Sequence, residues 1–273
     1  MTLRLPTFLS FLFFSFTLHA QIETDRPDFT ESPNVVPRRV LQVESGFVFQ
    51  HERQQYCGSE EVYKDIALNT TLLRYGITDK FELRLNWLLA QNGVTAESFP
   101  TLVACTDNLG NYPDTSFTQT GLTPLFVGYK TNLIKTDRFS LGMLGHLYLP
   151  FTAHERYRPS HYAAEFYVPM SFSINENWGI ATQFSMSWDG DSPRSTTGYT
   201  LSISRSIGDK LGAYIEPFGY FTENGGEEHW INGGFTYLVN DRFQLDLTGG
   251  QGLSGTSATF VSTGLSFMVG GSK

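Results

Sequence analysis

Nine ionisable residues occupy polar positions inside largely alternating apolar stretches, and their chemistry depends on whether the fold gathers them. They are Glu44, Arg74, Glu82, Arg84, Lys130, His146, Glu165, Glu216 and Asp246. Around a water-filled passage, such charges form a selectivity filter, and the excess of acids would favour cations modestly. Packed against one another, they form ion pairs that stiffen a narrow interior. The sequence leaves both interpretations open.

Catalytic chemistry has weaker support. His146 is the one histidine placed within a predicted strand, beside Tyr148, whereas His154 and His161 lie in a loop-like stretch with Ser160. A hydrolase needs a nucleophile, a base and an orienting group within hydrogen-bond reach. The sequence has neither the G-x-S-x-G nor the H-E-x-x-H pattern, no metal-ligand spacing and no phosphate-binding glycine loop. We therefore expect no enzyme, catalytic residue, metal or cofactor, with a lipase or protease as the enzyme alternative.

The segments that carry these residues have a side-chain period of two. In residues 81–89, FELRLNWLL, the odd positions are apolar and the even positions are mostly polar. Successive side chains of a β-strand point to opposite faces, so this segment predicts a strand with one apolar and one polar face. Glu82 and Arg84 then lie on the polar face.

The same alternation predicts about twelve strands along the chain. They span approximately residues 40–50, 62–75, 81–89, 120–133, 139–149, 162–173, 178–188, 199–204, 211–221, 231–239, 243–248 and 257–268. Short polar turns follow the second, fourth, sixth, eighth and tenth strands. Longer loops follow the odd strands, and the longest covers about residues 91–118. An even strand count with this asymmetry is typical of bacterial outer-membrane barrels.

A membrane barrel accounts for the two faces better than a soluble β domain. Most of the predicted strands have about nine to twelve residues, the length that a tilted strand needs to cross a bilayer. Strands of soluble proteins usually have about five or six. A dry core would not accept the charges of the polar face, and in water the aromatic face would form a large apolar patch. We predict an all-β fold, a closed antiparallel transmembrane β-barrel in contact with outer-membrane lipid, with short periplasmic turns and longer extracellular loops.

Composition and the first residues indicate an exported protein. The chain has 273 residues, of which 40% are hydrophobic and 15% aromatic, enough for one large β domain. A formal net charge of −8 without a basic stripe argues against a nucleic-acid partner. Residues 1–20 combine Arg4, an apolar run at 8–18 and a final Ala20, which predicts a cleaved signal peptide, with a membrane anchor as the alternative. We expect export to the outer membrane of a Gram-negative bacterium.

Residues 21–39 are polar, contain three prolines and predict neither helix nor strand. We interpret them as an N-terminal periplasmic segment that precedes a barrel at 40–273. With Asp25, Arg26 and Asp28, the segment would act as a plug or gate whose charges pair with interior residues such as Arg74 or Arg84. An ordered tether that closes the barrel seam is the other interpretation, and it is the one that the sequence favours.

Cys57 and Cys105 are the two cysteines of the chain, and both lie in polar, loop-like stretches. In an exported protein, such a pair favours one disulfide. Two unpaired thiols are the alternative, which the sequence leaves open.

Three motifs carry a resemblance to a known family. They are ETDRPDFTESP at residues 23–33, VESGF at 43–47 and LRYG at 73–76. With them, the chain resembles the bacterial outer-membrane transporters of the MetA-pathway of phenol degradation family over most of its length. The resemblance implies an outer-membrane β-barrel through which small molecules pass. The family's name says little about the substrate.

The expected function is an outer-membrane channel or transporter for small molecules, aromatic or otherwise hydrophobic ones included. A structural or adhesin-type barrel, whose 91–118 segment binds a partner, is the alternative. One departure concerns assembly, because many outer-membrane barrels end in an aromatic residue that the assembly machinery recognises. Here six residues follow Phe267, so this signal is displaced or absent.

Overall fold

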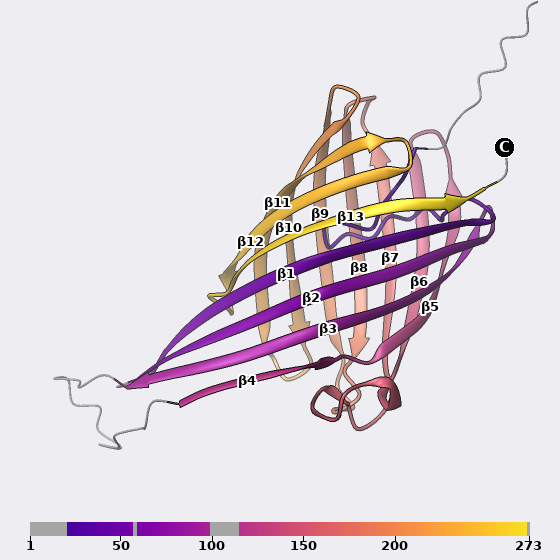
Figure 1. Ribbon diagram of the computed structural model, residues 1–273. Coiled ribbons are helices and arrows are strands. Elements are labelled where there is room, and N and C mark those ends of the chain that lie inside the picture. Colours follow the sequence, from indigo (N-terminus) through magenta and orange to yellow (C-terminus); the bar gives the residue numbers. More distant parts are fainter. Residues whose placement is uncertain (1–20, 57–58, 99–114, 272–273) are drawn as a thin grey trace, which may run out of the picture.

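The computed structural model describes residues 21–56, 59–98 and 115–271, which form a β-barrel with an N-terminal segment inside it (Figure 1). Both cysteines, Cys57 and Cys105, and the predicted signal peptide at 1–20 lie outside the described residues. The described strands are β1 Val40–Tyr56, β2 Ser59–Thr78, β3 Phe81–Ser98, β4 Thr115–Leu122, β5 Leu125–Lys135, β6 Phe139–Leu149, β7 Ala163–Ser173, β8 Trp178–Trp188, β9 Thr196–Ile207, β10 Leu211–Thr222, β11 Glu227–Asn240, β12 Phe243–Ser254 and β13 Thr259–Gly270.

Twelve of these strands close the barrel, and all pair antiparallel. β1 closes the sheet against β13, from the pair Val40–Gly270 to the pair His51–Thr259. Closure gives hydrogen-bond partners to the first and last strands, which would otherwise be free edges. The predicted closed antiparallel barrel of about twelve strands is confirmed.

β4 is the additional strand, and a proline separates it from β5. β5 pairs with residues 81–86 of β3, and β4 continues along the same edge at residues 89–96. Pro124 stands between β4 and β5, and proline has no N–H to donate to a ladder. The single strand predicted at 120–133 is therefore interrupted.

Several predicted strand ends are wrong, and the largest differences are at the ends of β1, β3 and β12, which runs to Ser254. β1 continues to Tyr56 and β3 to Ser98, so part of the predicted 91–118 loop is strand. These extensions carry mostly polar residues and lack the alternation, yet they pair with β2 along its length. Figure 1 shows β1, β2 and β3 projecting beyond the other strands. Outside the lipid, backbone pairing needs no apolar face.

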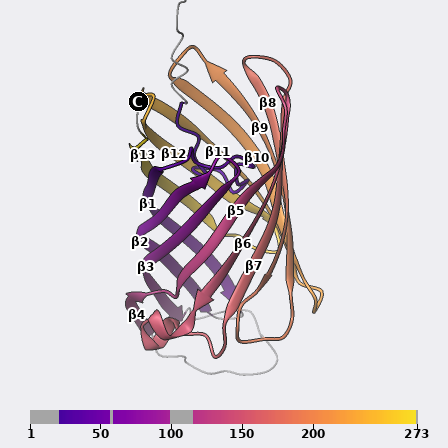
Figure 2. The same ribbon diagram turned by 90° about the vertical axis from the view of Figure 1, so that its right-hand side faces the viewer.

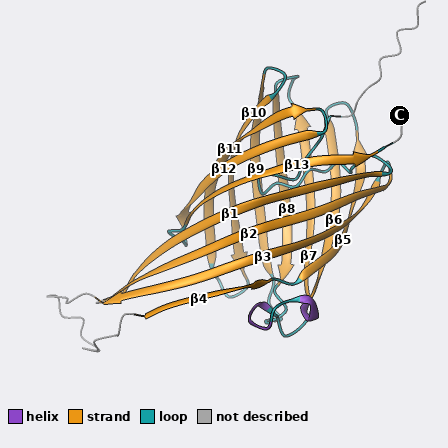
Figure 3. Ribbon diagram, in the orientation of Figure 1, coloured by secondary structure: helices purple, strands orange, loops and turns teal. Residues whose placement is uncertain are grey.

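Short turns gather at one end of the barrel, which we call the turn end. They are residues 79–80, 136–138, 174–177, 208–210 and 241–242. Both ends of the closing strand pair, Val40 and Gly270, lie there too. At the opposite loop end, residues 150–162 and 189–195 form longer connections, seen as loops and two single 3-10 turns in Figure 3. The predicted asymmetry fails after β1, β10 and β12, whose connections are short because the strands pair almost to their ends.

Apolar side chains cover the outside of the barrel and polar side chains fill the interior, which we call the lumen. On three separate strands, Leu83, Phe184 and Leu247 are each about half exposed on the outer surface, whereas Glu82 and Lys130 are fully buried inside. Trp178 and Trp188 lie at the two ends of β8, as aromatic residues do at the two membrane–water interfaces. No helix in the described part of the chain is long and apolar enough to cross a membrane.

Candidate functional site: the lumen and the inserted segment

Residues 21–39, which we call the inserted segment, lie in the lumen near the turn end (Figure 1, Figure 2). Its backbone does not pair in a β-sheet, so its buried N–H groups need other hydrogen-bond acceptors. Three of them donate to glutamates of the wall. The N–H of Asp25 donates to Glu44 at 3.1 Å, that of Thr30 to Glu216 at 2.8 Å, and that of Val36 to Glu82 at 2.7 Å. These acceptors come from β1, β10 and β3, and together they fix the path of the segment across the lumen.

Asp25 is the centre of an ion cluster that joins the inserted segment to three strands. Its carboxylate contacts Arg74 of β2 at 3.0 Å, Arg84 of β3 at 2.7 Å and Lys130 of β5 at 2.6 Å. All four side chains are almost completely buried. Burial raises the pKa of Asp25, but the three cations outweigh this effect and hold its pKa well below the usual range.

Three further carboxylates complete the ion cluster and nearly balance its charge. Their contacts with the cations measure 2.8 to 3.1 Å: Glu82 with Arg74, Glu44 with Arg74, and Glu31 with both Arg84 and Lys130. Four carboxylates therefore surround three cations. Buried charges need such partners, because the loss of hydration is costly for each of them.

Arg26 of the inserted segment fits a slot in the barrel wall. Its guanidinium donates to both oxygens of Asp246, at 3.0 and 3.2 Å, and to the Ser262 hydroxyl at 3.0 Å. Gly46 and Gly264 are paired across β1 and β13, and an added Cβ on either would lie 2.5 Å from the guanidinium. The arginine thus occupies the space that two side chains would otherwise take.

The middle of the inserted segment lies against Glu216 and an aromatic patch. Glu216 accepts hydrogen bonds from the backbone N–H of Phe29 at 2.9 Å and from Asn232 at 2.6 Å. The Phe29 ring stacks on Phe218 with centroids 4.4 Å apart. Burial and the neighbouring Glu216 raise the pKa of Asp28 well above its usual range. In the described structure, Asp28 forms no ion pair with a cationic side chain.

A second polar cluster, distinct from that around Asp25, lies on β6 and β7. His146 Nδ1 is 3.3 Å from Glu165 Oε2, and the Tyr148 hydroxyl donates to the same oxygen at 2.8 Å. The His146 ring stacks on Phe126 at 4.0 Å. Within the described residues, no serine or threonine hydroxyl hydrogen-bonds to His146, and no group of acidic or histidine side chains is arranged to hold a metal ion.

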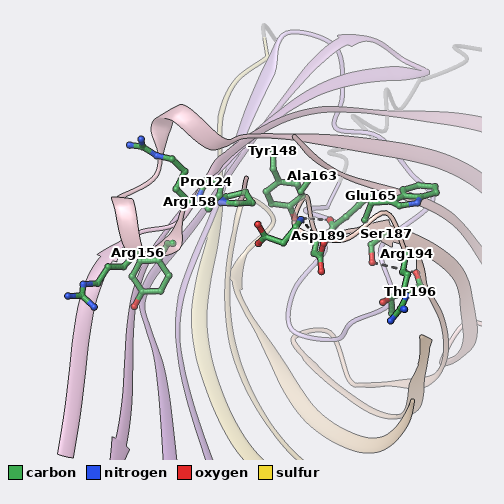
Figure 4. Close-up of a pocket in the computed structure, with 14 residues that line it drawn as sticks. Pro124, Tyr148, Arg156, Arg158, Ala163, Glu165, Ser187, Asp189, Arg194 and Thr196 are labelled. Atoms are coloured by element: carbon green, nitrogen blue, oxygen red, sulfur yellow. Dashed lines mark hydrogen bonds between the residues drawn. The ribbon is translucent and has the colours of Figure 1, made fainter. Parts of the chain in front are cut away.

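Two cavities connect the inserted segment to the loop end. The inner one, which we call the chamber, has a volume of about 280 Å³ and is lined on one side by Asp28, Phe29 and Glu31 of the inserted segment. The outer one, the vestibule, has a volume of about 480 Å³ and lies under the 150–162 and 189–195 loops (Figure 4). Both are lined by Glu165, Ser187 and Thr196, so they adjoin.

The structure places all nine predicted residues on the lumen side, eight of them buried and Glu165 partly exposed. Five gather around Asp25, namely Glu44, Arg74, Glu82, Arg84 and Lys130. Asp246 lies beside Arg26, Glu216 beside Thr30, and His146 and Glu165 stand apart from the cluster.

Glu31, the Gly46–Gly264 slot and the Phe29 stack were not predicted. The one available signal for Glu31 and Phe29 was their presence in the 23–33 motif, beside the acids and arginine already singled out. The slot had no local signal, because its glycines are far apart in the sequence.

Comparison with solved structures supports the fold. An outer membrane channel from Pseudomonas putida F1 superposes with a TM-score of 0.63 and 12% sequence identity, covering 87% of this chain and 98% of that one. The KdgM porin (TM-score 0.48, 11% identity, 81% and 98% covered) and the Ralstonia pickettii toluene transporter TbuX (TM-score 0.45, 8% identity, 86% and 90% covered) are more distant. No protein of curated function matches the sequence.

The sequence itself matches a family model from the inserted segment to the last strand. The match covers residues 24–269, and thus both the barrel and the residues that lie within it. The chain belongs to the family described as "Putative MetA-pathway of phenol degradation".

Proposed function

We propose that this protein is an outer-membrane channel for small solutes that its inserted segment closes at the periplasmic end. The Asp25 cluster is the observation that carries the proposal. Three cations on the wall, with Glu44 and Glu82, leave an excess of one positive charge, and the segment brings Asp25 and Glu31 to them. Insertion thus joins opposite charges across the lumen, which is the arrangement of a plug.

Orientation follows from the general architecture of outer-membrane barrels. Their short turns face the periplasm and their longer loops face the cell exterior. The turn end, where the inserted segment lies, is then periplasmic, and the vestibule opens outside. The proposal includes export by a signal peptide in residues 1–20, insertion into outer-membrane lipid by the assembly machinery, and no catalytic step.

Aromatic and otherwise hydrophobic molecules are within the proposed range of solutes. The chamber is lined by Phe29, Tyr167 and Tyr220 as well as by hydroxyl-bearing residues, and apolar lining with a few polar groups is usual for small-molecule sites. The family description, which refers to phenol degradation, is compatible with this range but does not identify a substrate.

Recording from planar bilayers tests the proposed plug. The intact protein should give rare openings, and a variant lacking residues 21–39 should give a steady, larger conductance, because the segment no longer fills the lumen. The faster migration of folded barrels in unheated electrophoresis checks that the variant is assembled. If the deletion variant is not assembled, the double variant Asp25→Ala with Arg26→Ala replaces it. An assembled variant with unchanged conductance would contradict the proposal.

Two acids of the inserted segment give the plug a pH dependence. Asp25, whose pKa is lowered, stabilises insertion above the usual aspartate pKa, and this stabilisation is lost as the pH falls through the lowered value. Asp28 has the opposite effect, because its pKa is raised in the inserted state. The free energy of insertion becomes less favourable as the pH increases from the usual aspartate pKa to the raised pKa of Asp28. Openings should be rarest in mildly acidic solution and more frequent on either side. Asp28→Asn should flatten the alkaline side of this profile; an unaltered profile would argue against the assignment.

A structural or adhesin-type barrel is the second candidate, and the projecting strands favour it. β1 to β4 extend past the other strands at the loop end, and Phe117 of β4 is half exposed there. A variant with a shortened extension would distinguish the adhesin function from the channel function. Loss of cell-surface binding with unchanged conductance would support the adhesin, and unchanged binding would exclude it.

A further inference from the structure

The chamber between the inserted segment and the wall has the size and lining of a binding site. Its volume of about 280 Å³ is slightly below the roughly 300–1,000 Å³ of sites for drug-sized ligands, so its ligand would be smaller. The rings of Phe29, Tyr167 and Tyr220 line it. Tyr220 has a hydroxyl that forms no hydrogen bond within the described residues. A ligand can therefore occupy the chamber without displacing an existing contact of this group.

The charges around the chamber are unbalanced, unlike those of the Asp25 cluster. Asp28 and Glu165 line it, and Glu216 lies beside Asp28. In the described structure, none of these three acids forms an ion pair with a lysine or arginine. Their hydrogen bonds come from neutral groups or from His146: Ser202 to Asp28, Tyr148, Tyr167 and His146 to Glu165, and Phe29, Thr30 and Asn232 to Glu216.

The acids of the chamber favour the uptake of a positive charge. The pKa of Asp28 is raised by burial and by Glu216, so this acid retains a proton at a pH where an exposed aspartate has lost it. A cation that entered the chamber would take the place of this proton.

We infer that the chamber binds a small organic cation, a primary ammonium group on an aromatic or otherwise apolar body. The inference rests on the proposed function and names its solute class. An ammonium group has three donors and no acceptor, which suits carboxylates and an unpaired tyrosine oxygen. Aromatic faces attract cations most strongly where water is excluded. A carboxylate of the same size would face Asp28 and Glu165 without a free cation nearby.

The vestibule provides access for such a molecule. Figure 4 shows Glu165, Ser187 and Thr196, the residues shared with the chamber, on one side of the vestibule lining and Arg156 at the other. Asp189 and Asp191 line the vestibule together with its arginines, so charges of both signs face the entering solute. Because the vestibule does not favour one sign of charge, selection between cations and anions takes place at the chamber.

Titration calorimetry on the intact, detergent-solubilised protein tests the inference with three probes of similar shape. Benzylamine, which is protonated at neutral pH, should bind; benzyl alcohol should bind at least tenfold more weakly, and benzoate should show no binding. Benzylamine should also bind more tightly as the pH rises from acidic to neutral, because the proton on Asp28 leaves more easily. Equal affinity for the alcohol and the amine would overturn the inference.

Two charge-removing variants locate the site. Asp28→Asn and Glu165→Gln should each weaken benzylamine binding by about tenfold or more, whereas Glu176→Gln, in the exposed turn between β7 and β8, should leave it unchanged. Migration in unheated electrophoresis shows whether each barrel is assembled. Unchanged affinity in both assembled variants would overturn the site. Binding to the closed protein requires no conductance, so a failure here is distinguishable from a failure of the plug.

Discussion

Replacing Asp25 with alanine is expected to raise the frequency of channel openings by about 100-fold or more. The substitution removes the carboxylate that contacts Arg74, Arg84 and Lys130, and it leaves Lys130 with Glu31 as its remaining ion-pair partner in the described structure. Removing one member of a buried ion pair typically costs about 3–5 kcal/mol, and every 1.4 kcal/mol or so changes a population tenfold. The cost falls on the inserted state, because water hydrates the three cations when the segment is withdrawn.

Single-channel recording at neutral pH measures this effect. Asp209→Ala is the matched control, because Asp209 lies in the exposed turn between β9 and β10 and is the same residue type. The control should open as rarely as the unmodified protein. If the Asp25→Ala variant is assembled and opens no more often than its control, the ion cluster does not hold the segment in place.

Gly264→Ala should release the segment by a different route. The new Cβ would lie 2.5 Å from the Arg26 guanidinium, so the arginine would have to leave its position against Gly46 and Gly264. Displacing Arg26 breaks its contacts with Asp246 and leaves that buried carboxylate without its cation. The expected cost of about 3 kcal/mol or more corresponds to an approximately 100-fold rise in opening frequency.

A double-mutant cycle separates this steric effect from a general weakening of the barrel. Arg26→Ala alone should raise opening as strongly as Gly264→Ala, and the combined variant should add little to either one, because both remove the same contact. Gly249→Ala is the control, since its added Cβ would have an ordinary contact of 3.4 Å. Fully additive effects of Arg26→Ala and Gly264→Ala would show that the glycine does not act through the arginine.

Alternation was sufficient to predict the barrel because lipid and lumen are two different solvents on the two faces of each strand. In β3, the apolar side chains face the lipid and the charged side chains face the lumen, as the structure shows. The apolar ones are Phe81, Leu83 and Leu85, and the charged ones are Glu82 and Arg84. Beyond the lipid the constraint disappears. The ends of β1 and β3, with polar residues on both faces, were therefore predicted as loop, although their backbones pair with β2.

The charged residues were predictable as a set, but their partners were not. Asp25 was expected to meet Arg74 or Arg84, and the structure places it beside both and beside Lys130. Arg26 meets Asp246, 220 residues away along the chain, and no local pattern relates the two. Such pairs depend on which strands face each other across the closed lumen, and that depends on register and tilt rather than on composition.

The long sequence separations of the inserted segment also set an order of events during folding. Its binding groups come from strands as distant as β1, β5, β10, β12 and β13, so the full set of sites is not assembled until the last strand joins the first. Contacts between residues so far apart form late, because the chain entropy is lost before they contribute. Residues 21–39 precede every strand in the chain, yet we expect them to find their final position after all the strands. An unfinished barrel would therefore hold a hydrated, charge-lined trough, and seating of the segment would mark the moment at which the wall is complete.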